Sequence, residues 1–249
     1  MQRHQGNVAL ITGAASGIGR ATAVRLASEG ASVMLTDVNL AGLEETVSML
    51  PAGTAVLAVE HDVTQLASCQ QVVEQCISKF GRLDVLCNIA GISLCRHLAD
   101  ITPEEWQRIV NINLNGVFFM CQAAMPKLVE SRGNIVNMAS TAGLEGLAYN
   151  AAYCATKAAV VMFSKSLALE FSGKGVRVNA VCPGAVETPL SSAFEMPEGA
   201  DPALLGRMFP LLDMSKPEEI AAAVAYLSSP EARFVTGVAF AIDGGQTAG

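Results

Sequence analysis

Seven short apolar segments alternate with longer helix-forming segments along almost the whole chain. The apolar segments lie at Val8–Thr12, Ser32–Thr36, Ala55–Val59, Val85–Cys87, Asn134–Met138, Arg177–Val181 and Val238–Ala241. Most are continuous apolar runs, which is typical of strands covered on both faces. Helical patterns fall between them, at about 17–30, 40–50, 65–79, 103–130, 150–171 and 216–228. This alternation predicts an α/β fold: a doubly wound parallel sheet of about seven strands with helices on both faces.

The composition supports one globular domain. Of the 249 residues 51% are hydrophobic and only 16% charged, enough apolar material for a large core. No apolar run approaches the roughly 18 residues that a membrane helix needs. No linker or repeat divides the chain, so we expect a single domain over residues 1–249. Because residues 1–7 do not form a secretory signal, we expect a cytoplasmic protein with no membrane contact.

Charge, cysteine and histidine content exclude several classes of partner. A net charge of −7 argues against nucleic acid. The seven cysteines are scattered and never spaced CxxC, which predicts buried free thiols rather than a disulfide scaffold. The three histidines, His4, His61 and His97, have no metal-binding spacing, so no metal site is expected. We interpret His97 as a loop histidine rather than a second catalytic base.

A glycine-rich turn follows the first strand directly and opens a helix. Its sequence is Gly13-Ala14-Ala15-Ser16-Gly17-Ile18-Gly19. Gly13 allows the sharp turn, while Gly17 and Gly19 leave room for a diphosphate and for close helix packing. Backbone amides at a helix N-terminus attract anions. The context therefore predicts a dinucleotide site formed by Gly13, Ser16, Gly17, Ile18 and Gly19, although a plain tight turn is the simpler alternative.

Asp37 ends the second strand, eighteen residues after Gly19. A carboxylate at this place can accept both ribose hydroxyls of the adenosine and would repel a 2′-phosphate. Neither Ser16 nor the following Val38 and Asn39 supplies a cation for such a phosphate. The sequence therefore predicts NAD as the cofactor rather than NADP. The alternative is that Asp37 is a helix cap or a solvated loop charge.

Tyr153 and Lys157 are four residues apart in a helix-forming stretch, so they share a helix face. Free tyrosine ionises near pH 10, and a neighbouring ammonium brings its pKa closer to neutrality. The pair is a candidate proton-transfer group, although chance pairs on solvated helix faces are common. Tyr149 has Tyr153 rather than a lysine four residues on and is not a candidate.

Together these residues resemble the short-chain dehydrogenase/reductases. The glycine loop, the YxxxK pair and Ser140, thirteen residues before Tyr153, have that family's order and spacing. Asn88-Ile89-Ala90-Gly91 is similar to its NNAG motif, with Ile89 in place of the second asparagine. Asn113 and Pro183-Gly184 extend the resemblance over residues 7–243. It implies a Rossmann-like domain that commonly forms homotetramers.

The resemblance also implies a role for each matched residue. Tyr153 would be the general base in oxidation and the acid in reduction. Lys157 would hold the nicotinamide ribose and lower the pKa of Tyr153, and Ser140 would bind the substrate oxygen. Asn113 would hold a water that continues a proton relay from Lys157. Further cofactor contacts are implied for Asp62, Val63, Asn88, Ala90, Gly91, Pro183, Gly184, Val186 and Thr188.

The segment 189–214 has no clear periodicity and many apolar residues, which is typical of a lid or binding segment. We interpret it as a substrate-binding flap; the alternative is that it packs onto the core or a second subunit. The predicted activity is NAD-dependent interconversion of an apolar secondary alcohol, alicyclic or steroid-like, and its ketone by hydride transfer. The alternatives are a 3-oxoacyl-thioester reductase of the acyl-carrier-protein type and a non-catalytic NAD-binding redox sensor.

A homotetramer would need apolar helix faces. We expect them on the 103–130 helix, with Val110, Leu114, Val117, Phe118 and Cys121, and on the alanine-rich 151–159 stretch.

Overall fold

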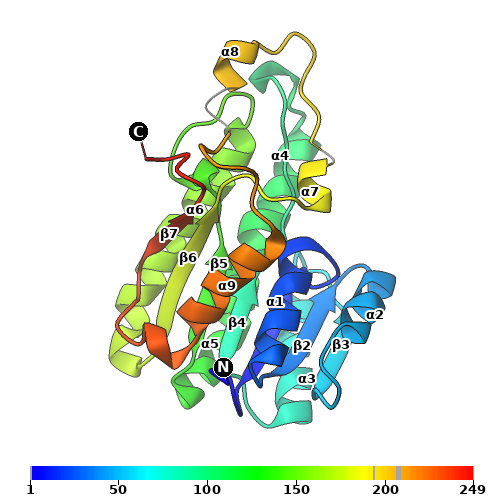
Figure 1. Ribbon diagram of the computed structural model, residues 1–249, viewed down its shortest axis with the longest axis vertical. Helices are drawn as coiled ribbons and strands as arrows, with labels where there is room; N and C mark the ends of the chain where they lie inside the picture. Colours follow the sequence, from blue (N-terminus) through cyan, green and yellow to red (C-terminus); the bar gives the residue numbers. More distant parts are fainter. Residues whose placement is uncertain (1, 193, 206–208, 249) are drawn as a thin grey trace.

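Seven parallel strands form one sheet in the order β3-β2-β1-β4-β5-β6-β7 in the computed structural model (Figure 1). The structure describes residues 2–192, 194–205 and 209–248. The strands are β1 (Val8–Thr12), β2 (Ser32–Asp37), β3 (Val56–Glu60), β4 (Val85–Asn88), β5 (Asn134–Met138), β6 (Arg177–Pro183) and β7 (Ala239–Ile242). The chain order reverses where β1 pairs with β4. The predicted doubly wound, Rossmann-like sheet is therefore confirmed, with strand ends shifted by one or two residues.

Helices cover both faces of this sheet. One face packs against α1 (Gly17–Ser28), α2 (Leu40–Ser48) and α9 (Pro217–Ser228). The other packs against α3 (Leu66–Phe80), α5 (Gly116–Ser131) and α6 (Ala151–Phe171). The strands' carboxyl ends point toward the end of the molecule that carries the short helices α7 (Pro189–Ser192) and α8 (Pro202–Leu205) (Figure 1). The cleft described below opens at these strand ends.

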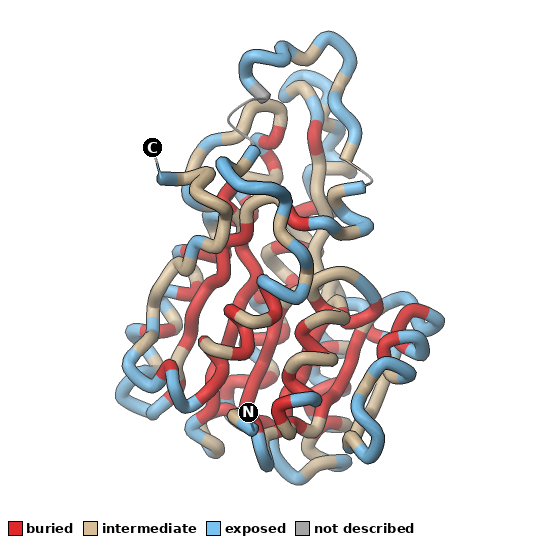
Figure 2. The backbone as a smooth tube through the Cα atoms, in the orientation of Figure 1, coloured by how far each residue is buried: buried red, intermediate tan, exposed pale blue. Residues whose placement is uncertain are grey.

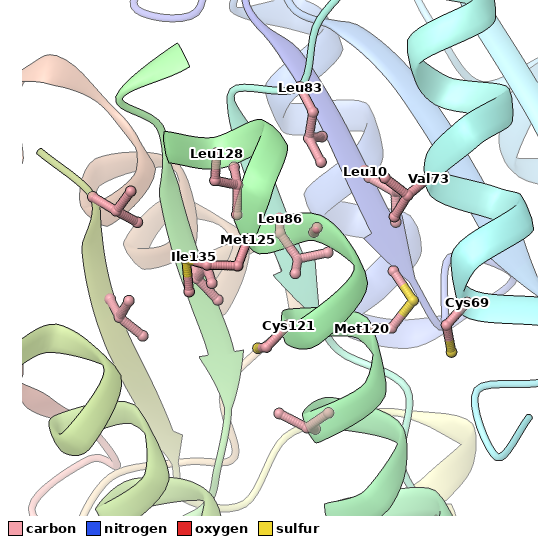
Figure 3. Packing of buried hydrophobic residues seen from close by; sticks show 14 of the residues in the cluster. Leu10, Cys69, Val73, Leu83, Leu86, Met120, Cys121, Met125, Leu128 and Ile135 are labelled. Carbon is pink, nitrogen blue, oxygen red and sulfur yellow. The ribbon is translucent and has the colours of Figure 1, made fainter. Parts of the chain in front are cut away.

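Two cores explain why the strands are continuously apolar. Leu10, Leu86 and Ile135 stand side by side on β1, β4 and β5 and face α5 (Figure 3). Their neighbours Ile11 and Val136 belong to the core on the opposite face. Both side-chain directions of each central strand are thus buried, and Figure 2 shows these strands buried over nearly their whole length.

The predicted helix over 103–130 is interrupted. It consists of α4 (Pro103–Val110), a π-helical segment (Asn111–Asn115) and α5. A capping box starts α4: the Thr102 hydroxyl accepts from the Glu105 amide at 3.2 Å, and the Glu105 carboxylate accepts from the Thr102 amide at 3.1 Å. Periodicity alone could not show the wider turn, which holds Asn113. Single π-turns are frequent at functional sites.

The interface prediction needs a correction. Val117 and Cys121 are buried in the core of their own chain and face the sheet, so they are not available to a second subunit. Phe118 of α5 and Met162 of α6 are exposed. Assembly into a homotetramer stays a prediction, with these two side chains in place of the buried ones.

All seven cysteines are free thiols and six of them are buried, as predicted. Within the described residues, no helix is long and apolar enough to cross a bilayer.

Glu29 fixes the N-terminal segment to α1. Its carboxylate accepts from Arg3 Nη2 at 2.6 Å and from Arg25 Nε at 2.5 Å, and its side chain is only 5% exposed. Burial alone would raise the pKa of Glu29, but hydrogen bonds and charges of the two arginines hold it at about 2. Since the folded pKa lies below the unfolded one, this stabilisation is complete above about pH 4.5 and is lost as the pH falls through 2.

We therefore expect Glu29→Gln to lower the free energy of unfolding at pH 7 by on the order of 2 kcal/mol. Urea denaturation between pH 7 and pH 2 measures this free energy. The difference in unfolding free energy between the variant and the wild type should become smaller as the pH falls. Glu231→Gln is the matched control, because Glu231 pairs with Arg3 from a 47% exposed side chain and such pairs contribute little. A difference that stays constant with pH would contradict this account.

Candidate active site

A cleft of about 760 Å³ lies across the carboxyl ends of the strands. The turns after β1, β2, β3, β4 and β6 and the end of β5 all reach it, and its wall also includes residues of α6 and α7 and Phe194, Met196, Phe209 and Met214. Ligands of open α/β sheets bind at this edge, where the strand order reverses.

The glycine turn forms the floor at one end of the cleft. Gly13 has φ +68°, and a Cβ there would lie 2.8 Å from the Ala90 backbone, so only glycine fits. Ser16 gives α1 no side-chain cap, and no acidic residue occupies the first turn of α1. The amides at the start of α1 are thus left for an anion from outside the helix. The predicted residues Gly13, Ser16, Gly17, Ile18 and Gly19 all line the cleft, and the cradle fits a diphosphate.

Asp37 lines the cleft at the end of β2. One carboxylate oxygen accepts from the Ala15 amide at 3.1 Å and the other from the Asn39 amide at 3.0 Å. These bonds hold the carboxylate beside the glycine turn and leave lone pairs for further donors. The arrangement fits a ribose diol.

Asp62 and Val63 line the cleft after β3, as predicted, together with His61. His61 is a site residue that the sequence reasoning missed. Its Nδ1 lies 3.1 Å from the Thr36 hydroxyl and its Nε2 3.4 Å from the Cys69 sulfur. Burial lowers the pKa of His61 to about 4. The ring is therefore neutral at physiological pH and fixes the wall of the cleft.

Ser140, Tyr153 and Lys157 meet at the middle of the cleft. Ser140 follows β5, and its hydroxyl accepts from the Ala142 amide at 3.2 Å. Both other side chains come from the same face of α6, and Lys157 Nζ lies 5.6 Å from the centre of the Tyr153 ring. Lys157 is 4% exposed and donates to the Met138 carbonyl at 2.9 Å. The sequence therefore predicted a set of side chains that the fold does bring together.

The pKa of Tyr153 differs from the expectation. Burial raises it above its ordinary value of 10, and the hydrogen bond with the Ser140 side chain opposes this only in part. Burial also lowers the pKa of Lys157, to about 8. In both side chains desolvation therefore outweighs the contacts that favour the charged form. In this structure Tyr153 is a protonated phenol at neutral pH.

Asn113 does not line the cleft but lies directly behind it. It is fully buried. Its side chain makes two hydrogen bonds with the backbone of Ile92: Oδ1 accepts from the Ile92 amide and Nδ2 donates to the Ile92 carbonyl, both at 2.9 Å. A Cβ on Gly91 would lie 3.3 Å from Asn113 Oδ1 and 3.5 Å from Lys157 Nζ. The two side chains thus flank Gly91, and the proton relay through Asn113 stays a prediction.

Asn88 is not among the residues that line the cleft, and its contact with a cofactor stays a prediction. Nδ2 donates to Asn137 Oδ1 at 2.8 Å, and Asn137 in turn donates to Ser164 at 2.9 Å. This buried network ties β4 to β5 and α6, so Asn88 supports the sheet below the cofactor region. The other residues predicted from the resemblance line the cleft: Ala90, Gly91, Pro183, Gly184, Val186 and Thr188.

Comparisons with known proteins show the family of this chain. A family model described as Enoyl-(Acyl carrier protein) reductase matches residues 13–247. The chain is 41% identical over 247 residues to a 3-oxoacyl-(acyl-carrier-protein) reductase of Thermotoga maritima, covering 98% of each chain. The chain belongs to the short-chain dehydrogenase/reductase family. Like other members of this family, it is an oxidoreductase.

Two further relatives of this short-chain dehydrogenase/reductase differ from each other in the substrates that their names give. The cyclohexanol dehydrogenase of an Acinetobacter species is 38% identical over 243 residues, covering 96% of this chain and 94% of that protein. The crystal structure of a 3-ketoacyl-(acyl-carrier-protein) reductase from Brucella melitensis complexed with NADH superposes with a TM-score of 0.89. Its sequence is 38% identical, covering 98% of this chain and 99% of that one.

Several polar residues that line the cleft were not predicted from the sequence, among them Arg108, Asn150 and Gln246. Gln246 comes from the C-terminal tail and donates to the Glu145 carboxylate at 2.9 Å. No local signal marks Gln246 or Asn150. Arg108 stands four residues before Ile112, which also lines the cleft, so helical spacing could have indicated it.

The predicted flap forms the apolar end of the cleft. The described part of the wall includes Leu190, Phe194, Met196, Phe209 and Met214, with Leu147 opposite. The predicted flap range 189–214 also contains residues 193 and 206–208, which lie outside the described residues. Within the described residues, no group of three or more His, Cys, Asp or Glu side chains is placed to hold a metal ion.

Proposed function

We propose that this enzyme uses NAD(H) to interconvert an apolar secondary alcohol, alicyclic or steroid-like, and its ketone. The observation that carries the proposal is the continuity of one cleft. It joins the glycine turn and the Asp37 carboxylate to Ser140, Tyr153 and Lys157, and then to an apolar wall. A substrate on that wall would have its oxygen beside the phenol.

Each group has a distinct task in this reaction. The nicotinamide supplies or removes the hydride when it is bound. Ser140 donates a hydrogen bond to the substrate oxygen, whose negative charge grows as a ketone is reduced. Tyr153 gives that oxygen a proton in reduction and takes it back in oxidation. Lys157 would hold the nicotinamide ribose through its ammonium.

The raised pKa of Tyr153 sets the direction of the pH dependence. The acid form is fully populated at neutral pH and serves ketone reduction. The base form becomes populated only as the pH rises, so alcohol oxidation should gain with pH throughout the alkaline range.

NAD is preferred over NADP in this proposal because the Asp37 carboxylate, held beside the glycine turn, would repel a 2′-phosphate. The neighbouring side chains Val38 and Asn39 bring no cation to offset the repulsion.

A second activity is favoured by the relatives. The Thermotoga maritima protein and the NADH-bound Brucella melitensis protein carry the name of 3-oxoacyl-carrier-protein reductases. A structure with NADH also means that Asp37 does not argue against this activity. A 3-oxoacyl thioester would place its keto group at Tyr153 and its acyl chain on the same apolar wall. A non-catalytic NAD-binding sensor is the weakest alternative, because no catalytic side chain is missing.

A substrate panel tests the proposal. Cyclohexanol, a hydroxysteroid and a 3-hydroxyacyl thioester are oxidised with NAD at alkaline pH, and the matching ketones are reduced with NADH at pH 7. We expect the highest kcat/KM for one of the two cyclic alcohols. A higher kcat/KM for the thioester would establish the second activity, and NADH binding without turnover of any substrate would support the sensor.

A further inference from the structure

The flap is tied to the body of the enzyme by two side chains outside the catalytic group. His97, in the loop before α4, donates from Nε2 to the Glu198 carbonyl at 2.9 Å. The Tyr149 hydroxyl accepts from the Asp201 amide at 2.8 Å. Asp201 then caps α8, since its carboxylate accepts from the Ala203 amide at 2.8 Å. The stretch 198–201 is therefore held at both ends.

The two side chains that hold it are also in contact with each other. The His97 and Tyr149 rings meet edge to face, with centres 5.0 Å apart. The backbones of the two loops are joined next to this contact, because the Arg96 amide donates to the Tyr149 carbonyl at 2.8 Å. The pair is thus one unit, and in Figure 1 α8 lies beside the loop that leads into α4. We call His97 and Tyr149 the flap latch.

The backbone of Tyr149 is strained. Its φ is +63°, a region that bulky side chains rarely adopt. Arg132 also has positive φ, but it ends α5 as an ordinary left-handed cap. Tyr149 ends no helix, and glycine would take this conformation without strain. A tyrosine here indicates that its side chain is required.

The latch lies next to the substrate end of the cleft. Leu147 and Asn150, on either side of Tyr149, line the cleft, and Tyr153 follows one helical turn later. On the flap, Phe194 and Met196 line the cleft and precede the latched stretch by only a few residues. Releasing the stretch 198–201 would therefore loosen the apolar wall without touching the cofactor cradle.

We propose that Tyr149, together with His97, is a positioning residue that holds the flap closed on an apolar substrate and so sets substrate affinity. The latch orders Phe194 and Met196 before the substrate binds, which reduces the entropy lost on binding. Cofactor binding and the proton transfer at Tyr153 do not depend on it.

Tyr149→Phe tests the proposal, because it removes the hydroxyl and keeps the ring against His97. Hydrogen–deuterium exchange should become faster at residues 194–205 and stay unchanged in the central strands. KM for the alcohol should rise about 3- to 10-fold, the value of one hydrogen bond, while KM for NAD stays constant and kcat does not fall. The kinetic part rests on the proposed function, but the exchange part does not.

Tyr226→Phe is the matched control. It removes the same atom from a tyrosine of α9 that does not line the cleft. It should leave both exchange at 194–205 and KM unchanged. Unchanged exchange at 194–205 in Tyr149→Phe would overturn the latch, whether or not a substrate has been found. Faster exchange with an unchanged KM would overturn the role in substrate affinity.

Two further variants separate positioning from plain stability. His97→Phe keeps an aromatic ring against Tyr149 but loses the donor to the Glu198 carbonyl. In the double variant with Tyr149→Phe, the effects on exchange at 194–205 and on KM should be smaller than the sum of the effects of the two single variants. Full additivity would contradict a single latch. Tyr149→Gly relieves the strained backbone, so the urea midpoint should not fall although KM rises. A lower urea midpoint with an unchanged KM for the alcohol would mean that Tyr149 stabilises the fold and does not position the flap.

Discussion

Tyr153→Phe should lower kcat for alcohol oxidation by a factor of about 10² to 10⁴, the range that general acid–base catalysis contributes. The phenylalanine ring fills the same space on α6, so the cleft and its cofactor contacts remain. Only the hydroxyl that exchanges a proton with the substrate oxygen is lost. Stopped-flow and steady-state rates with NAD and the best alcohol of the panel measure the effect.

The binding of NADH provides the control for this variant. Its dissociation constant, followed by the fluorescence of the reduced nicotinamide, should change by less than about threefold, because Lys157 and the glycine turn are intact. The remaining activity should also lose the rise with alkaline pH that the wild type shows. Residual activity within tenfold of wild type would assign the proton transfer to another group.

The fold was predictable because it rests on local patterns. Continuous apolar runs such as Val8–Thr12 report strands buried on both faces, and the glycine turn fixes where the first crossover begins. The same applies to most of the site, since Gly13, Asp37 and Ser140 stand at or just after the ends of strands of one sheet. Parallel strands bring their carboxyl ends to one edge, so sequence position there also gives position in space.

The remaining features depend on contacts between distant segments. The π-turn at Asn113 is stabilised by the backbone of Ile92, twenty-one residues away, and periodicity does not report it. Asn88 has the position of a cofactor ligand in the sequence, but β5 and α6 supply its partners. The pKa of Tyr153 depends on how much water the folded chain excludes. Gln246 lines the cleft from the tail after β7, where its side chain binds Glu145, 101 residues earlier in the chain.

The choice of cofactor gives the second large expected effect. Asp37→Asn should lower the ratio of kcat/KM for NAD to that for NADP by about 10- to 100-fold, chiefly by lowering KM for NADP. The amide retains one oxygen, which can accept from the Ala15 amide that now lies 3.1 Å from the carboxylate, while the second bond, from the Asn39 amide, is lost. What disappears is the repulsion between a carboxylate and a 2′-phosphate, which costs several kcal/mol at close range.

Adding a cation next to Asp37→Asn should shift the cofactor preference further toward NADP. Val38 is 66% exposed and lines the cleft beside Asp37, so Val38→Arg places a guanidinium where a phosphate can bind it bidentately. The double variant Asp37→Asn with Val38→Arg should prefer NADP. Asp62→Asn is the matched control: it neutralises a carboxylate at the same end of the cleft, and it should alter both cofactors alike. If that control shifts the ratio as much as Asp37→Asn does, the preference comes from the overall negative potential of the cleft rather than from a contact at the ribose.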